Sequence, residues 1–355
     1  LIGSSAQLVI PGAPVNVLAT GDNNAIATAN GASAALGLSI SAMLPTAKVG
    51  GAVMAEFSGQ MSGGSASLLN VLALGENTAT ATVKVAGIGM LGGGAGANSI
   101  AEITLQADVT ARVGVNAMIA TTGAVIVDAR LQGMKNKAYA EALGLAGGGF
   151  AGVSVMLAEA RVGGSVIADF DGDVTTASMV TVEADGKNLA EAHTVALALG
   201  GGLGGSLTGA IAQVTEFADV EATVGSSSSI TTNGAVLVKA EGDNDAIADS
   251  DAGSAGGLGG ISASSLEAIV GGGVKAELNG DVTNASSVKV EAIGDNNAQA
   301  TAFAIAIGGL GAGAGADAYA EVSSGADVEA LIGSSAQLVI PGAPVNVLAT
   351  GDNNA

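Results

Sequence analysis

The sequence predicts an all-β protein, a repetitive β-solenoid-like stacked-sheet fibre with small packing faces of Ala, Gly and Ser. Three observations lead to this fold class. The first 25 residues recur without change as residues 331–355, so the chain repeats with a period of 330 residues. Inside that period a unit of about 55 residues recurs six times, and such fixed-period similarity is typical of repeat architectures. Most of each unit alternates small and larger side chains with a period of two, which is the side-chain period of a β-strand.

The composition sets limits on the class of protein. The 355 residues include 57 Gly, 2% aromatic residues, 12% charged residues and no Cys, so any core must be built from small side chains. A hydrophobic content of 48% excludes a polar, disordered chain. Gly clusters interrupt every apolar run before it reaches the roughly 18 residues that a membrane-spanning helix needs. The net charge of −21 argues against nucleic acid and anionic membranes as partners, and favours divalent cations or basic surfaces.

Each unit begins with the pattern V-x-V-x-A, which is followed by G-[DEK]-N, and we expect a turn at this second motif. The pattern starts at Val15, Leu69, Val125, Val180, Val236, Val288 and Val345. Its most constant residue is an asparagine, found at Asn23, Asn77, Asn136, Asn188, Asn244, Asn296 and Asn353. If equivalent turns lie in register, the amide side chains form a hydrogen-bonded asparagine ladder. The alternative is that asparagine tolerates the left-handed backbone of a tight turn and needs no neighbour.

Two kinds of unit alternate along the chain. Units one, three and five carry a V-G-G motif at residues 49–59, 162–172 and 270–280, whereas units two, four and six carry A-D-V-x-A-x-[VI]-G at residues 107–114, 218–225 and 326–333. The motifs lie 28 and 30 residues after the Ala that follows each asparagine, and an even difference preserves the face of a strand. We therefore expect one continuous array over residues 1–355, built from double units at about 15–124, 125–235 and 236–344.

The segment after each asparagine has one face made almost only of Ala, Ser and Gly. In unit six this face runs from Ala298 to Gly308, and strand is favoured over helix because frequent Gly would destabilise a helix by about 1 kcal/mol each. The opposite face begins with polar residues and continues with Phe303, Ile305 and Ile307. We expect such strands to run from a wetted rim into a core, and to be held by neighbouring strands, since Gly costs entropy on ordering.

Catalytic chemistry has little basis in this chain. One His and no Cys leave few ways to pair a nucleophile with a base, and His193 occupies a position where the other units carry varied polar residues. The glycines from Gly92 to Gly96 lack the following helix of a phosphate-binding loop. We therefore expect no enzyme activity and no organic cofactor.

Two groups of acidic residues are candidates for cation binding. Asp169, Asp171 and Asp173 resemble the start of a calcium loop but lack its glycine and final glutamate, so a turn with solvated acids is the better interpretation. A second set recurs at one place in alternate units, namely Asp108, Asp219 and Asp327. Our hypothesis is that Ca²⁺ or Mg²⁺ bridges these acidic edges. The alternative is that the acids keep an apolar fibre soluble and guard its sheet edges.

The succession of V-x-V-x-A, G-D-N-N-A, alternating Ala, a Gly-rich patch and A-D-V-x-A resembles the repeat regions of giant filamentous-haemagglutinin-like and leukotoxin-type bacterial adhesins. The resemblance covers essentially the whole chain. It implies secretion across an outer membrane, an extracellular or cell-surface location, a β-solenoid shaft and a role in attachment, and it carries over no functional residues. One departure is the lack of long aliphatic rows in the Ala and Gly strands, which favours flatter and more tightly packed layers.

These observations favour a structural protein, a segment of a long extracellular filament or adhesin shaft. Its expected partners are further copies of itself and a host or neighbouring cell surface. The alternative is a ligand-binding surface module on a β-solenoid scaffold that recognises a glycan, a cation-coated surface or ice, although Thr78, Thr80 and Thr82 form the one tidy threonine row. An enzyme of the parallel β-helix type is the least favoured reading.

Overall fold

Every regular element of the protein is a β-strand. The computed structural model describes residues 1–131, 133 and 135–355, and these residues contain 26 strands and no helix. Within this described part there is accordingly no helix that could cross a membrane. The all-β prediction is confirmed.

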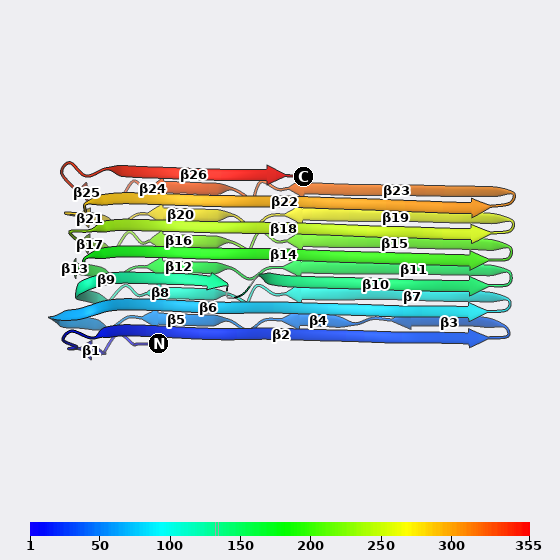
Figure 1. Ribbon diagram of the computed structural model, residues 1–355, viewed down its shortest axis with the longest axis horizontal. Coiled ribbons are helices and arrows are strands. Elements are labelled where there is room, and N and C mark those ends of the chain that lie inside the picture. Colours follow the sequence, from blue (N-terminus) through cyan, green and yellow to red (C-terminus); the bar gives the residue numbers. More distant parts are fainter. Residues whose placement is uncertain (132, 134) are drawn as a thin grey trace.

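The strands form three sheets, and all pairings between strands are parallel. The front sheet has 13 strands and contains the long strands that run from left to right in Figure 1. Its members are β1 (Gln7–Leu8), β2 (Pro14–Ala35), β6 (Gln60–Gly89), β9 (Met118–Leu131), β10 (Asn136–Gly148), β13 (Asp173–Thr176), β14 (Met179–Gly200), β17 (Ser229–Thr231), β18 (Ala235–Gly256), β21 (Asp281–Thr283), β22 (Ser287–Gly308), β25 (Leu338–Val339) and β26 (Val345–Asn354).

Two smaller sheets lie behind the front sheet (Figure 1). The seven-stranded turn-side sheet follows the two-residue turns that end the long strands, and it contains β3 (Leu38–Met43), β4 (Thr46–Val49), β7 (Gly92–Ile103), β11 (Ala151–Val162), β15 (Leu203–Val214), β19 (Gly259–Val270) and β23 (Gly311–Val322). The six-stranded loop-side sheet contains β5 (Val53–Phe57), β8 (Val109–Val113), β12 (Val166–Phe170), β16 (Val220–Val224), β20 (Val274–Leu278) and β24 (Val328–Ile332).

The predicted solenoid-like stacked fibre with small packing faces is wrong and is corrected here. The parallel sheets do not form a clear solenoid stack, since they differ in strand number and the front sheet mixes long strands with short ones. Unit one divides its turn-side strand into β3 and β4, whereas β6 joins a short and a long strand into one. The packing faces are also not small throughout, because one of the two cores is built from Val, Ile, Leu and Phe.

The interior changes in character along the long strands. Between the front and loop-side sheets, side chains such as Phe57, Phe170 and Leu278 are fully buried. Between the front and turn-side sheets the core is mostly Ala. At the turns only Gly fits, because a Cβ atom on Gly200 would overlap the carbonyl oxygen of Leu203. The two layers therefore converge toward the turns, and the inward side chains shrink in step.

The predicted turn at G-[DEK]-N does not exist, since β2, β6, β14, β18 and β22 each run through it without interruption. Its glycine serves packing instead, because a Cβ atom on Gly186 would overlap Cγ2 of Val220 on the opposite sheet. The asparagines also do not use left-handed backbone: Asn284 is the one non-glycine residue with positive φ among the described residues. A space requirement and a turn requirement both select glycine, and the sequence does not separate them.

The predicted orientation of the long strands is also reversed. The small Ala, Ser and Gly face points inward, and the face with large apolar residues points to solvent. Phe303 is 55% exposed and Ile307 is 62% exposed. Close approach of the two layers explains this arrangement, since only the small face fits between them.

We predict that Gly204→Ala destabilises the protein by about 1–3 kcal/mol, the usual cost of overpacking a tight interior. The added methyl group would overlap the carbonyl oxygen of Ala255. Gly205→Ala on the same strand is the matched control, because its methyl group would come no closer than 4.0 Å to Val153 Cγ2. Urea unfolding of both variants checks this, and equal midpoints would contradict the convergence of the layers.

Candidate functional site: a buried asparagine row

The seven asparagines that mark the units lie in one row along the middle of the front sheet. Each Nδ2 donates a hydrogen bond to Oδ1 of the asparagine in the next unit. The six donor-to-acceptor distances are 2.8 Å for Asn23 to Asn77, 2.9 Å for Asn77 to Asn136, 3.0 Å for Asn136 to Asn188, 2.8 Å for Asn188 to Asn244, 2.9 Å for Asn244 to Asn296 and 2.8 Å for Asn296 to Asn353. Parallel in-register pairing of the strands brings these side chains together.

The second proton of each amide group has its own acceptor. The layer opposite the front sheet is interrupted between the turn-side and loop-side sheets, and the connecting segment exposes a backbone carbonyl there. Asn188 Nδ2 donates to the carbonyl oxygen of Ala218 at 3.1 Å, and Asn244 Nδ2 donates to that of Gly272 at 3.0 Å. The other internal asparagines and Asn23 repeat this contact with Gly51, Ala107, Gly164 and Ala326.

This row solves a physical problem of the fold. Asn77, Asn136, Asn244 and Asn296 have no exposed surface, and an unpaired polar group at such a place would cost about 1–3 kcal/mol. Both amide protons and the oxygen of each internal asparagine are used. A carbonyl that the broken layer would leave unsatisfied is satisfied at the same time. The row therefore joins successive units and closes the gap between the two cores.

The aspartates of the cation hypothesis bind the backbone of the neighbouring unit. Asp108 Oδ1 accepts hydrogen bonds from the backbone nitrogen of Ser165 at 2.9 Å and from its Oγ at 2.7 Å. Asp219 Oδ1 accepts from the nitrogen of Gly273 at 2.8 Å, and burial raises its pKa although this bond opposes the rise. Asp327 is exposed. The intervening unit thus separates the three carboxylates, and sequence reasoning missed Ser165 and Gly273 as their partners.

The run Asp169, Asp171 and Asp173 is held by protein groups. Arg112 forms ion pairs with both Asp169, at 3.1 Å, and Asp171, at 3.0 Å, while Asp173 Oδ1 accepts from the backbone nitrogen of Ser229 at 3.0 Å. Burial, together with the charge of Asp171, raises the pKa of Asp169 to about 6. The described residues contain no group of three or more acidic, His or Cys side chains arranged to hold a metal ion. Bridging by Ca²⁺ or Mg²⁺ stays a prediction.

Two further sequence features lie on the outer face of the front sheet. His193 is half-buried, with its Nδ1 3.5 Å from Asp249 and its ring centre 5.5 Å from that of Tyr139, so its neighbours come from the adjacent units. Thr78, Thr80 and Thr82 lie on β6 opposite Lys137, Tyr139 and Glu141 of β10. The threonine row therefore does not continue onto this neighbouring strand.

Comparison with known proteins found no matching family model, no similar curated protein and no similar solved structure. A functional argument for this chain accordingly starts from its own geometry. The best-organised site in the described residues is the asparagine row, whose partners are other units of the same repeat.

We predict that Asn188→Ala lowers the free energy of unfolding by about 2–4 kcal/mol. The substitution strands the amide of Asn136, the oxygen of Asn244 and the carbonyl of Ala218, all of which are buried, and each loss has a typical cost of about 1–3 kcal/mol. Asn353→Ala is the control, since this asparagine is exposed and only accepts one bond. Guanidinium unfolding measures both, and similar losses would show that the row contributes little.

We predict that the protein is more stable near pH 5 than at pH 7.5. Burial raises the pKa of Asp128 to about 6 even though Arg130 lies beside it, and the pKa of Asp169 is raised similarly. A carboxyl whose pKa is higher in the folded state binds its proton there first, so stability falls as pH rises between about 4 and 6 or slightly above. Melting temperatures across this range test this. Asp128→Asn should flatten the profile, and an unchanged slope would contradict the assignment.

Proposed function

We propose that this chain is a structural protein, a segment of a long extracellular filament or adhesin shaft that grows by pairing repeated units side by side. The observation that carries the proposal is the placement of residues 331–355. Val345 pairs with Val288 just as Val15 pairs with Leu69, so the recurring segment occupies the position of a further unit in the same register.

The last paired strands are suited to accept another unit. Val345 and Val347 on β26 are 44% and 46% exposed, whereas the equivalent Val288 and Val290 on β22 are fully buried. The outer edges of β23 and β26 are also unpaired. Repeat proteins bury such faces against the next repeat, and the unit-to-unit hydrogen bonds transmit load along the array.

Attachment to a host or neighbouring cell surface belongs to the same proposal. What supports it is the repeat pattern, since a long, regular shaft positions an attachment site away from the surface that carries it. Further copies of the chain are the partners for which the geometry offers the clearest contacts.

We predict that chains of one, two and three periods lengthen by about 29 Å per period, six units at about 4.8 Å each. Their unfolding midpoints should rise with period number, because each added unit buries an open edge. Electron microscopy and urea unfolding measure the two quantities. Compact particles whose length and stability do not change with period number would overturn the proposal.

A further inference from the structure

Large apolar side chains cover both outer faces of the molecule near the turns. On the front sheet they include Leu197, Leu199, Phe303, Ile305 and Ile307, each more than 40% exposed. On the turn-side sheet they include Leu38, Ile40, Val153, Leu203 and Ile261, each 48% exposed or more. Exposed apolar surface of this extent marks an interaction surface in soluble proteins. The proposed shaft function does not use it.

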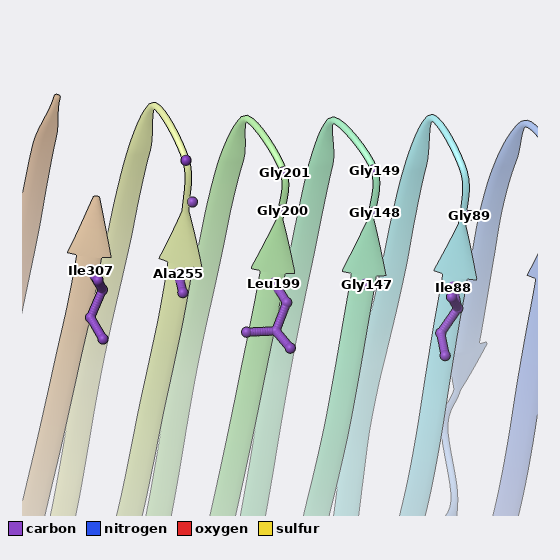
Figure 2. Close-up of a pocket in the computed structure, with 12 residues that line it drawn as sticks. Ile88, Gly89, Gly147, Gly148, Gly149, Leu199, Gly200, Gly201, Ala255 and Ile307 are labelled. Atoms are coloured by element: carbon purple, nitrogen blue, oxygen red, sulfur yellow. The ribbon is translucent and has the colours of Figure 1, made fainter. Parts of the chain in front are cut away.

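The front-sheet surface has a relief that repeats every second unit. At the last outward position before the turn, Ile88, Leu199 and Ile307 alternate with Gly147 and Ala255, and each is in register with the next. Figure 2 shows these residues side by side at the ends of the arrows, with large and small side chains in turn. They line a groove together with the turn glycines. The ridges, two strands apart, are about 9.6 Å from one another.

The turn-side sheet carries the same relief with the opposite phase. Here the ridges are Ile40, Val153 and Ile261, which belong to units one, three and five. The grooves are Gly94, Gly205 and Gly313, which belong to units two, four and six. Val153, Gly205, Ile261 and Gly313 line one groove on this face. The front-sheet ridges lie in the even units and the turn-side ridges lie in the odd units.

We propose that a second copy of this chain packs laterally on the first, with the front sheet of one copy against the turn-side sheet of its neighbour. When two copies point the same way without axial shift, the ridge of each unit faces the groove of the same unit. Leu199 then enters the groove at Gly205, and Ile261 enters the groove at Ala255. Both surfaces interlock at once because their phases are opposite.

The distribution of charge fits this contact. The ridge and groove positions near the turns carry no charged residue, whereas the outer faces of the other half carry acids such as Glu183, Glu221 and Glu329. Copies with a net charge of −21 repel one another through that acidic half. Salt screens this repulsion and leaves the apolar contact, so association strengthens with ionic strength. The contact uses opposite faces of each copy, and repetition therefore produces open layers of filaments.

The first test fills the grooves. Gly94→Val, Gly205→Val and Gly313→Val combined place on the even units the residue that Val153 supplies on an odd one. The fold accommodates the change, since the nearest atom to a Cβ at Gly94 is Ile40 Cγ1 at 3.5 Å and nothing lies within 4 Å at Gly313. A control combining Gly3→Val, Thr110→Val and Thr223→Val adds apolar surface elsewhere. Circular dichroism confirms that both variants fold.

Sedimentation velocity at low salt and at about 0.5 M salt follows association of the 355-residue chain. We expect the natural chain and the control to associate more strongly at high salt, and the groove-filled variant to associate at least about tenfold more weakly. A natural chain that stays monomeric in both conditions would overturn the proposal, as would a groove-filled variant that associates normally. The latter result leaves end-to-end growth intact, so the two proposals fail separately.

The second test establishes which faces meet. The chain has no cysteine, so Ala255→Cys and Ile261→Cys each introduce a single thiol. The two variants carry tags of different mass, are mixed equally and are oxidised gently. We expect the mixed disulfide to exceed both homodisulfides. Predominant pairing of Ala255→Cys with itself would mean a two-fold arrangement of front sheets and would overturn the proposed pairing.

Discussion

The close approach of the two layers is the constraint on which the rest of the structure depends. Toward the turns the backbones come so near that a single methyl group on Gly200 or Gly204 would overlap a carbonyl oxygen. The inward positions of β14 follow this narrowing, from Val180 and Val182 through a run of alanines to Gly200. The large apolar residues of these segments have no room inside, and they are placed on the outer faces.

The break in the rear layer produces the second requirement. Where the turn-side sheet ends and the loop-side sheet begins, a carbonyl group in each unit faces inward. An apolar side chain at this point would leave that carbonyl without a partner, at a cost of about 1–3 kcal/mol. Asparagine has two donors and an acceptor in one plane, so it satisfies the carbonyl, the unit before and the unit after.

The sequence predicted a good part of this arrangement. The period of two, the unit of about 55 residues and the alternation of two kinds of unit are properties of the chain itself, and the spacing of the asparagines pointed to the row that contains Asn136 and Asn188. The all-β class followed from the same pattern. These features repeat, and repetition is visible without coordinates.

Other features depend on distances between layers, which no repeat pattern contains. Gly186 could have served a turn or a close contact, and the position of Val220 decides between them. Asp108 could have faced a cation or a backbone nitrogen, and its partner Ser165 became evident from the pairing of neighbouring units. The inward direction of the small face, and hence the exposure of Phe303, required knowledge of how closely the layers pack.

The asparagine row also has a direction. The loop carbonyls fix the orientation of every amide group, because a carbonyl oxygen accepts only from Nδ2, and each remaining proton then points toward the next unit. The amide dipoles consequently add along the array, and hydrogen bonds in such a chain polarise one another. One end of the array presents an oxygen at Asn23 and the other presents protons at Asn353. Two such arrays match head to tail, whereas two like ends would bring acceptor against acceptor or donor against donor.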